Sequence, residues 1–248
     1  MIRPRGLGDE AGEIRGRGQF RVPSQDLHQI TFMNILAPQL ANHLDTPEDL
    51  QRLIESDEIL SNAVLHDENI SNLQAKSFSA SEVRFEKINA TEAKLEKTGF
   101  SDVELLNCNL VATTMPESSW RRTLVKDSRC SGLQLQTSVL KDVTFANCRL
   151  NLANFRFAKL KDVCFKGCVL DEADFYSAEL ENVEFQNCSL DKVEFSGSKL
   201  KHVDLRTSDI LGITGISGLA GATIDSIQLI ALAPLLAQEL KLTIKDEE

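Results

Sequence analysis

The apolar residues of this chain recur at every fifth position over a long middle segment. In residues 161–180, KDVCFKGCVLDEADFYSAEL, the large apolar residues are Phe165, Leu170, Phe175 and Leu180. From position 145 to 205 every fifth residue is Phe or Leu, and the residue two places earlier is always Val, Cys, Ala or Ser. An α-helix repeats at about 3.6 residues and a simple strand at about 2, so this period belongs to neither.

Residues two places apart on an extended backbone point to the same side. A large and a small side chain at that spacing can both enter one core, while the other three residues of each pentad face water and turn the corner. We therefore expect the structural core of one coil to consist of Val163, Phe165, Cys168, Leu170, Ala173, Phe175, Ala178 and Leu180.

A second period sets the number of sides. The small inward residues repeat at twenty positions, as in Val143, Val163, Val183 and Val203. Like residues stack on like if each coil consists of four pentads. The pattern predicts an all-β solenoid, a four-sided parallel β-helix from about 61 to 210, whose roughly seven coils each rise about 4.8 Å.

These pentads, centred on AxF, VxF, CxL and AxL, resemble the bacterial pentapeptide repeat family over about 150 of the 248 residues. The resemblance implies a right-handed quadrilateral β-helix. It also implies a range of roles, because some members protect DNA gyrase from inhibitors by resembling duplex DNA, while most have no assigned role. The period is specific for the fold and not for an activity.

Two segments depart from the pattern. Within 71–90 the large residue precedes the small one, but each pair still supplies one of each size, so the coil is expected to continue. Near 115–130, Pro116 lacks an N–H for a strand ladder, and Trp120 is large for a slot that Leu usually fills. These residues predict a bulge or loop in the second segment.

The ends of a solenoid need caps, because terminal coils expose core residues and strand edges. Residues 33–60 are expected to form an N-terminal cap with a helix over 46–55, in which Thr46 is the N-cap and Pro47 the first helical residue. Residues 211–248 are expected to leave the repeat through turns and then to cap the last coil with a helix.

That C-terminal helix is expected to begin after Asp225 or Ser226 and to bend at Pro234. Its apolar residues exceed one core-facing stripe, so it can cap the last coil and also offer a face to a second copy. A homodimer and a monomer both remain open. Residues 1–32 lack periodicity, and they are expected to be a disordered tail or an artefact of the start site, with Met33 as the native start.

The net charge of −10 is unevenly distributed. Residues 1–25 carry +2, residues 26–70 carry −8, residues 71–210 carry −1 and residues 211–248 carry −3. The repeat lacks a basic stripe with interleaved aromatic residues, which argues against direct binding of nucleic acid. No run of about 18 apolar residues predicts a membrane span, and the start does not read as a secretory signal, so a cytoplasmic protein is expected.

No residue pattern predicts catalysis, a metal ion or a cofactor. The cysteines at 108, 148, 168 and 188 occupy small inward slots, where a free thiol behaves as a compact hydrophobe. Cys164 stands between two inward residues, so its side chain is expected to face outward, where it could react. The histidines show no ligand spacing: His28, His43, His66 and His202.

Two groups of residues are candidates for an interaction patch. One group is acidic and consists of Asp171, Glu172, Asp174, Asp191 and Glu194. The other is Trp120 with Arg121 and Arg122, where Trp120 is expected either to serve recognition at the surface or to fill the core of an irregular coil. Outward columns alternate in charge, as in Lys159, Glu179 and Lys199, which predicts ladder pairs on a solvated face.

We therefore expect a non-enzymatic protein-interaction or scaffold module whose protein partner is not identified by the sequence. The alternative is a DNA mimic that binds DNA gyrase or another topoisomerase and modulates it or protects it from inhibitors. Mimicry requires acidic columns spaced like phosphates, and the alternating charge argues against it.

Overall fold

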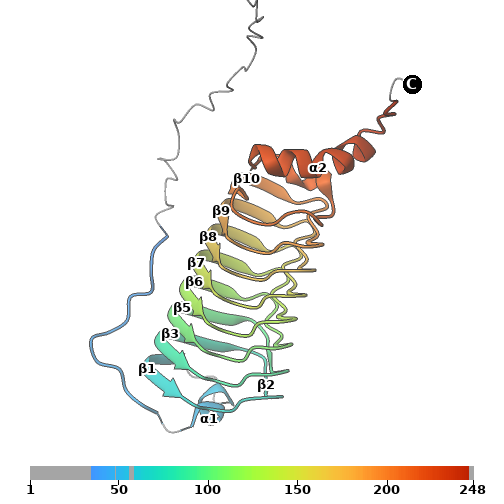
Figure 1. Ribbon diagram of the computed structural model, residues 1–248. Coiled ribbons are helices and arrows are strands. Elements are labelled where there is room, and N and C mark those ends of the chain that lie inside the picture. The colour runs from blue at the N-terminus through green and yellow to red at the C-terminus, as the bar shows by residue number, and fades with distance from the viewer. Residues whose placement is uncertain (1–34, 48, 56–58, 246–248) are drawn as a thin grey trace, which may run out of the picture. The chain divides into compact units, whose positions relative to one another are not determined.

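A computed structural model describes residues 35–47, 49–55 and 59–245. It confirms the predicted parallel β-helix, an all-parallel solenoid of about eight turns (Figure 1). One nine-stranded sheet, in the order β1-β3-β5-β6-β7-β8-β9-β10-β11, covers two adjacent sides, because its long strands run through a corner residue such as Asp162. Its strands are Ile59–His66 (β1), Phe78–Glu86 (β3), Thr98–Leu106 (β5), Ser119–Lys126 (β6), Val139–Ala146 (β7), Lys159–Lys166 (β8), Glu179–Gln186 (β9), Lys199–Asp204 (β10) and Ala222–Thr223 (β11).

The other sides pair over shorter stretches. A two-stranded sheet joins β2, Gln74–Ala75, to β4, Lys94–Leu95, and isolated parallel bridges continue the pairing along the remaining coils. From β1 to β10 each paired residue of a strand lies opposite the residue twenty positions away in the next strand, as Lys159 lies opposite Glu179. The twenty-residue period of the sequence is therefore the register of the coils.

The coil turns at residues with positive φ. In one coil these are Asp162, Gly167, Glu172 and Ser177, with φ between 53° and 61°. Such corners recur every five residues through most of the solenoid. Left-handed backbone conformation is tolerated best by Gly, Asn and Asp, which explains why small or polar residues dominate these corners, each directly before a small inward residue.

The inward residues fill the coil. Val163, Phe165, Cys168, Leu170, Ala173, Phe175, Ala178 and Leu180 are each at most 1% exposed. Aromatic rings stack from coil to coil, as between Phe155 and Phe175, whose centroids lie 4.8 Å apart with planes 6° from parallel. Large and small residues two places apart thus share one core, as the pentad pattern predicts.

The predicted bulge near 115–130 is wrong. β6 pairs without interruption with both β5 and β7, and Trp120 stands in the column between Phe100 and Leu140. Trp120 is 1% exposed, and its ring centroid lies 5.2 Å from that of Phe100. The same coil has smaller residues than usual in its two following large slots, Val125 and Cys130, so the extra volume of the indole is accommodated without breaking the coil.

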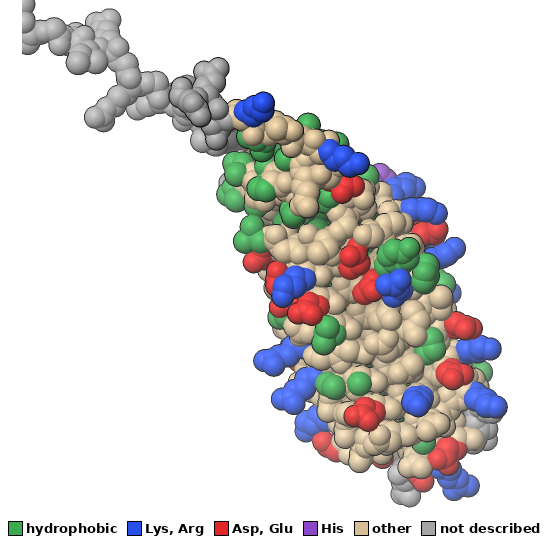
Figure 2. Space-filling view, turned by 90° about the vertical axis from the view of Figure 1, so that its right-hand side faces the viewer, with side chains coloured by type: hydrophobic (Ala, Val, Ile, Leu, Met, Phe, Trp, Pro, Cys, Tyr) green, Lys and Arg blue, Asp and Glu red, His purple; other side chains and the backbone are tan. Residues whose placement is uncertain are grey.

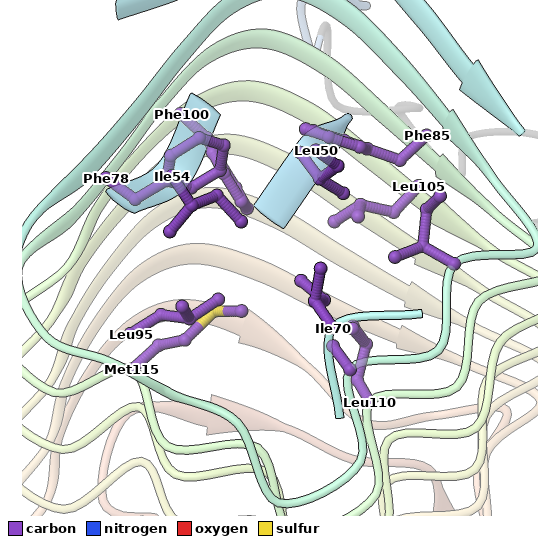
Figure 3. Close-up of a pocket in the computed structure, with 12 residues that line it drawn as sticks. Leu50, Ile54, Ile70, Phe78, Phe85, Leu95, Phe100, Leu105, Leu110 and Met115 are labelled. Carbon is purple, nitrogen blue, oxygen red and sulfur yellow. The ribbon is translucent and has the colours of Figure 1, made fainter. Parts of the chain in front are cut away.

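At the N-terminal end the helix α1 spans Leu50–Glu55 and closes the first coils. Its predicted start is wrong, because Asp49 and not Thr46 accepts the backbone N–H of Arg52, at 2.9 Å. Figure 3 shows Leu50 and Ile54 entering the coil among apolar residues that include Phe78, Phe85 and Phe100. A cavity of about 20 Å³ remains here, lined by apolar side chains.

At the other end a short helix, Ile216–Leu219, precedes α2, Ser226–Glu239. The prediction of Asp225 as a cap is confirmed, since its carboxylate accepts the N–H of Gln228 in a reciprocal capping box. The buried Gln228 amide donates to the carbonyls of Leu205 and Ser208, both at 2.7 Å. α2 therefore satisfies backbone acceptors that the last coil would otherwise leave open.

An extended segment, residues 35–45, runs along the solenoid wall and is called the strap here; the sequence did not predict it (Figure 1). The backbone N–H of Gln39 donates to Asp102, at 3.0 Å, and that of Leu36 to Asp142, at 3.3 Å. Asp45 then bridges to the first strand. The predicted tail at residues 1–32 lies outside the described residues.

Candidate interaction surface

The five predicted acidic residues gather on one part of the wall, and they are called the acidic patch here: Asp171, Glu172, Asp174, Asp191 and Glu194. Asp171 and Asp191 stand one above the other in adjacent coils, and the carboxylate of Asp171 accepts the N–H of Asp191 at 3.3 Å. Asp174 and Glu194 are also stacked in adjacent coils, where a parallel backbone bridge joins them. The solenoid register therefore brings together acids that are up to 23 residues apart in the sequence.

Basic side chains neutralise only part of this charge. Arg156 donates to the carboxylate of Asp174 at 2.8 Å, and Lys192 lies 3.8 Å from Glu172 and 3.9 Å from Asp191. With five acids and two basic partners, the acidic patch keeps a net charge of −3.

Glu194 is held in its charged form. Burial alone would raise its pKa, but hydrogen bonds from Ser196 and Thr214 and the charge of Arg156 lower the pKa below its ordinary value. The backbone N–H of Ser196 and the hydroxyl of Thr214 are the donors, the latter at 3.0 Å. The carboxylate is therefore fixed in place as well as ionised near neutral pH.

The structure places the second predicted group elsewhere. Trp120 is in the core, so it is not a surface recognition residue. Arg122 forms an ion pair with Asp102 beneath the strap, and its side chain is 15% exposed. Arg121 is exposed on the outer face of β6. Of the predicted interaction residues, only the five acids share one surface.

The outer face of β6 to β10 carries the opposite charge. It has six basic and two acidic side chains at alternate outward positions: Arg121, Lys141, Lys159, Lys161, Lys199 and Lys201, with Glu179 and Glu181. Each glutamate lies between two lysines, and the nitrogen-to-oxygen distances range from 2.8 to 3.6 Å. The wall of the solenoid is thus divided into an acidic and a basic region, and it is not uniformly acidic.

The inward cysteines are free thiols buried in the core. The thiols of Cys148 and Cys168 each donate to a carbonyl oxygen of an earlier coil at 3.4 Å. The expectation that Cys164 is an exposed thiol is wrong, because this side chain is only 7% exposed on the outer wall. Burial, together with the carboxylate of Glu184, raises the pKa of Cys164 to about 12. A reactive thiolate at neutral pH is therefore not expected there.

Two further searches of the described residues give negative results. Within residues 35–47, 49–55 and 59–245, no group of three or more His, Cys, Asp or Glu residues is arranged to hold a metal ion. Over the same ranges no helix is long and apolar enough to cross a membrane.

Comparison with known proteins identifies the repeat. Residues 138–214 match the family model described as the pentapeptide repeat region. No curated protein matches the chain.

Solved structures that resemble this one are distant in sequence. HetL, a pentapeptide repeat protein involved in heterocyst differentiation regulation in the cyanobacterium Nostoc sp. strain PCC 7120, is 18% identical, with 65% of this chain and 84% of that chain covered and a TM-score of 0.43. A trypsin-treated form of QnrB1, a plasmid-mediated fluoroquinolone resistance protein, is 19% identical, with 76% and 100% covered and a TM-score of 0.35. The family match identifies residues 138–214 as a pentapeptide repeat region, and the same twenty-residue register of the coils extends from there back to β1.

Proposed function

We propose that this pentapeptide repeat protein is a non-enzymatic, rigid scaffold in the bacterial cytoplasm that binds another protein through its wall. The observation that supports this most is the acidic patch, where five acids from adjacent coils lie on a wall fixed by parallel bridges and stacked rings. A preformed surface loses little conformational entropy when it binds, which favours recognition.

The interior offers little room for a substrate. Side chains fill the coils, and the cavity beneath α1 measures about 20 Å³, which is close to the volume that one water-sized sphere requires. The thiols that could act as nucleophiles are buried, and burial raises the pKa of Cys108 to about 11. Both features support a binding role over a catalytic one.

An affinity pull-down from the native host tests the proposal. The bait is the full chain, and the matched control is a bait in which Asp171→Asn, Glu172→Gln and Asp191→Asn remove charge from the acidic patch. We expect a specific partner that the wild-type chain retains and the control bait loses. Equal capture by both baits would show that the acidic patch is not the binding surface.

The second candidate function is a DNA mimic that binds DNA gyrase. The stacked acids of the acidic patch favour mimicry locally. The basic face of β6 to β10 opposes mimicry, because a positively charged DNA-binding groove of gyrase would repel that face. A supercoiling assay with purified gyrase, with and without a quinolone, separates the two candidates. Mimicry fails if substoichiometric protein changes neither supercoiling nor DNA cleavage.

A homodimer through α2 is part of the proposal. Ile227 and Ile230 on this helix are 77% and 75% exposed, and Leu240, Leu242 and Ile244 beyond it are each more than 60% exposed. Exposed apolar side chains this dense usually mark a contact surface. Light scattering of the wild type and of an Ile227→Ser, Ile230→Ser variant tests this, and a monomeric wild type would refute it.

A further inference from the structure

Two corners of the coil carry residues that do not suit a corner. Among the positive-φ positions that the structure describes, Leu152 and Phe157 are the only large apolar residues, with φ of 59° and 57°. Elsewhere these positions hold Gly, Asn, Asp and other small or polar residues, because a bulky side chain strains the left-handed backbone. Leu152 and Phe157 are consecutive corners of one coil, at the two ends of the same flat side.

Neither residue is there to fill the core. Leu152 is 58% exposed and Phe157 is 51% exposed. Figure 2, seen from the side on which Figure 1 places β2, shows hydrophobic side chains interspersed with acidic and basic ones along the wall. Both side chains therefore add little to the core, although each occupies a strained backbone position.

The two side chains border the acidic patch. Leu152 donates its N–H to the carbonyl of Asp171, at 3.0 Å. It occupies the same corner column as Glu172, one coil earlier. Phe157 packs edge-on against Tyr176, with ring centroids 5.7 Å apart.

Arg156 directly precedes Phe157 in the chain, and its cationic side chain is held in place by two contacts. The Arg156 guanidinium lies 4.3 Å from the centroid of the Tyr176 ring and is ion-paired with Asp174. Aromatic and arginine side chains held rigidly at a surface are typical of the residues that dominate binding energy in protein interfaces.

We propose that Leu152 and Phe157 are the apolar anchors of a docking site whose occupant is a basic, amphipathic segment of another protein. This proposal rests on the scaffold function above and names the chemistry of the partner. The anchors require apolar side chains in the occupant, and the net charge of −3 beside them requires lysine or arginine. A purely cationic ligand would leave Leu152 and Phe157 exposed, and a purely apolar one would leave the acids unpaired.

A displayed library of random linear peptides, panned against the full chain, tests the site. The key variant is Leu152→Asn with Phe157→Asn, because Asn already occupies equivalent corners at 147 and 187. We expect enriched peptides to combine apolar and basic residues, and to bind the variant about 30-fold more weakly. The variant should melt no lower than the wild type, since relief of backbone strain accompanies the loss of binding.

Two matched controls complete the design. Thr137→Asn changes the same corner column one coil earlier and should leave peptide affinity unchanged. Glu172→Gln should weaken binding and reduce its dependence on salt, because Glu172 contributes charge and not apolar surface. Enrichment of acidic or uncharged peptides, or of peptides that bind the Leu152→Asn, Phe157→Asn variant as well as the wild type, would overturn the proposal.

The native partner separates this inference from the scaffold function. If the pull-down partner binds the wild type and the Leu152→Asn, Phe157→Asn variant equally, the anchor site is refuted while the scaffold function stands. If the partner is lost with these two side chains and retained with Thr137→Asn, both are supported.

Discussion

The coils at the two ends of the solenoid have the same register but different packing. In the later coils the rings lie in parallel stacks, as in Phe145 on Phe165, at 5.1 Å and 5°, and Phe165 on Phe185, at 4.9 Å and 9°. In the earlier coils a ring is followed in its column by a different residue type, since Phe78 pairs with Thr98 and Phe85 with Leu105. The cavity and the inserted side chains of α1 are also found there. Equal backbone geometry therefore does not imply equal packing.

The sequence columns explain the difference. The later coils repeat one residue type in each column, so flat rings stack on flat rings. In the earlier coils Phe and Leu alternate with Ala in the same column, as in Ala80 before Phe100, and the gaps are filled from outside by Leu50 and Ile54. The family model matches residues 138–214, which is the uniform part. We infer that the later coils stabilise themselves, whereas the earlier ones depend on α1.

The largest effect is expected in the uniform coils. Phe165→Asp buries a charge among apolar neighbours with no partner, which costs more than the total stability of most domains of this size, so the chain should not fold. Lys161→Ala, on the outer face of the same strand, should change the free energy of unfolding by less than about 0.5 kcal/mol. Circular dichroism and thermal melting of both variants test the five-residue register, and equal tolerance would refute it.

The next effect should be confined to the earlier coils. Ile54→Ala enlarges the existing cavity beneath α1 and should destabilise this end by about 2–4 kcal/mol. Native-state hydrogen exchange should show lost protection in β1 and β3, with β8 and β9 unchanged.

Leu190→Ala is the matched control in the uniform part, where Leu190 is fully buried. It should lower protection throughout the later coils. If Ile54→Ala lowers protection equally along the whole solenoid, the two ends are not independent in the way that their packing indicates.

The same contrast shows what the sequence can predict. The uniform columns predict the fold, the register and the inward residues, because one period governs them all. Trp120 predicts a disturbed coil when it is considered by itself. The coil is regular because the next two large slots hold the smaller residues Val125 and Cys130, which offset the volume of the indole. Cys164 was expected to be exposed, yet outward position in a pentad does not determine burial by neighbouring side chains.

The candidate site was predicted less completely. The period-twenty columns bring the five acids together, so they could be found from the sequence. The strap could not be found from the sequence, because residues 35–45 carry no repeat. They bind the wall largely through backbone N–H groups, which do not depend on the type of side chain. Leu152 and Phe157 carry a signal that was available, namely a bulky apolar residue at a corner position, but its meaning depends on exposure that only the structure shows.

A pH-dependent effect is expected where the strap meets the wall. Burial alone would raise the pKa of Asp102, but hydrogen bonds from Arg122 and the N–H of Gln39 lower it below its ordinary value of about 3.9. The stability that this carboxylate contributes is therefore present above the unfolded-state pKa and is lost as the pH falls through the folded-state pKa. Asp102→Asn should cost about 1–2 kcal/mol at pH 7, because the amide oxygen still accepts a hydrogen bond but the charge is lost.

Denaturant unfolding from pH 7 down to pH 3 checks this prediction. The difference in the free energy of unfolding between wild type and Asp102→Asn should shrink as the solution becomes acidic. A difference that stays constant over this range would show that the charge of Asp102 does not stabilise the fold.

The smallest effect is expected on the basic outer face. Glu179 accepts hydrogen bonds from Lys199 and lies near Lys159, which lowers the pKa of its carboxyl group. All three side chains are largely exposed, so water and salt screen the interaction, and Glu179→Gln should cost at most about 0.5 kcal/mol. This small loss should disappear near 1 M salt, where charges interact only over about 3 Å. A loss that persists at high salt, measured by thermal melting of both proteins, would mean that packing along β9 and not the charge ladder contributes the stability.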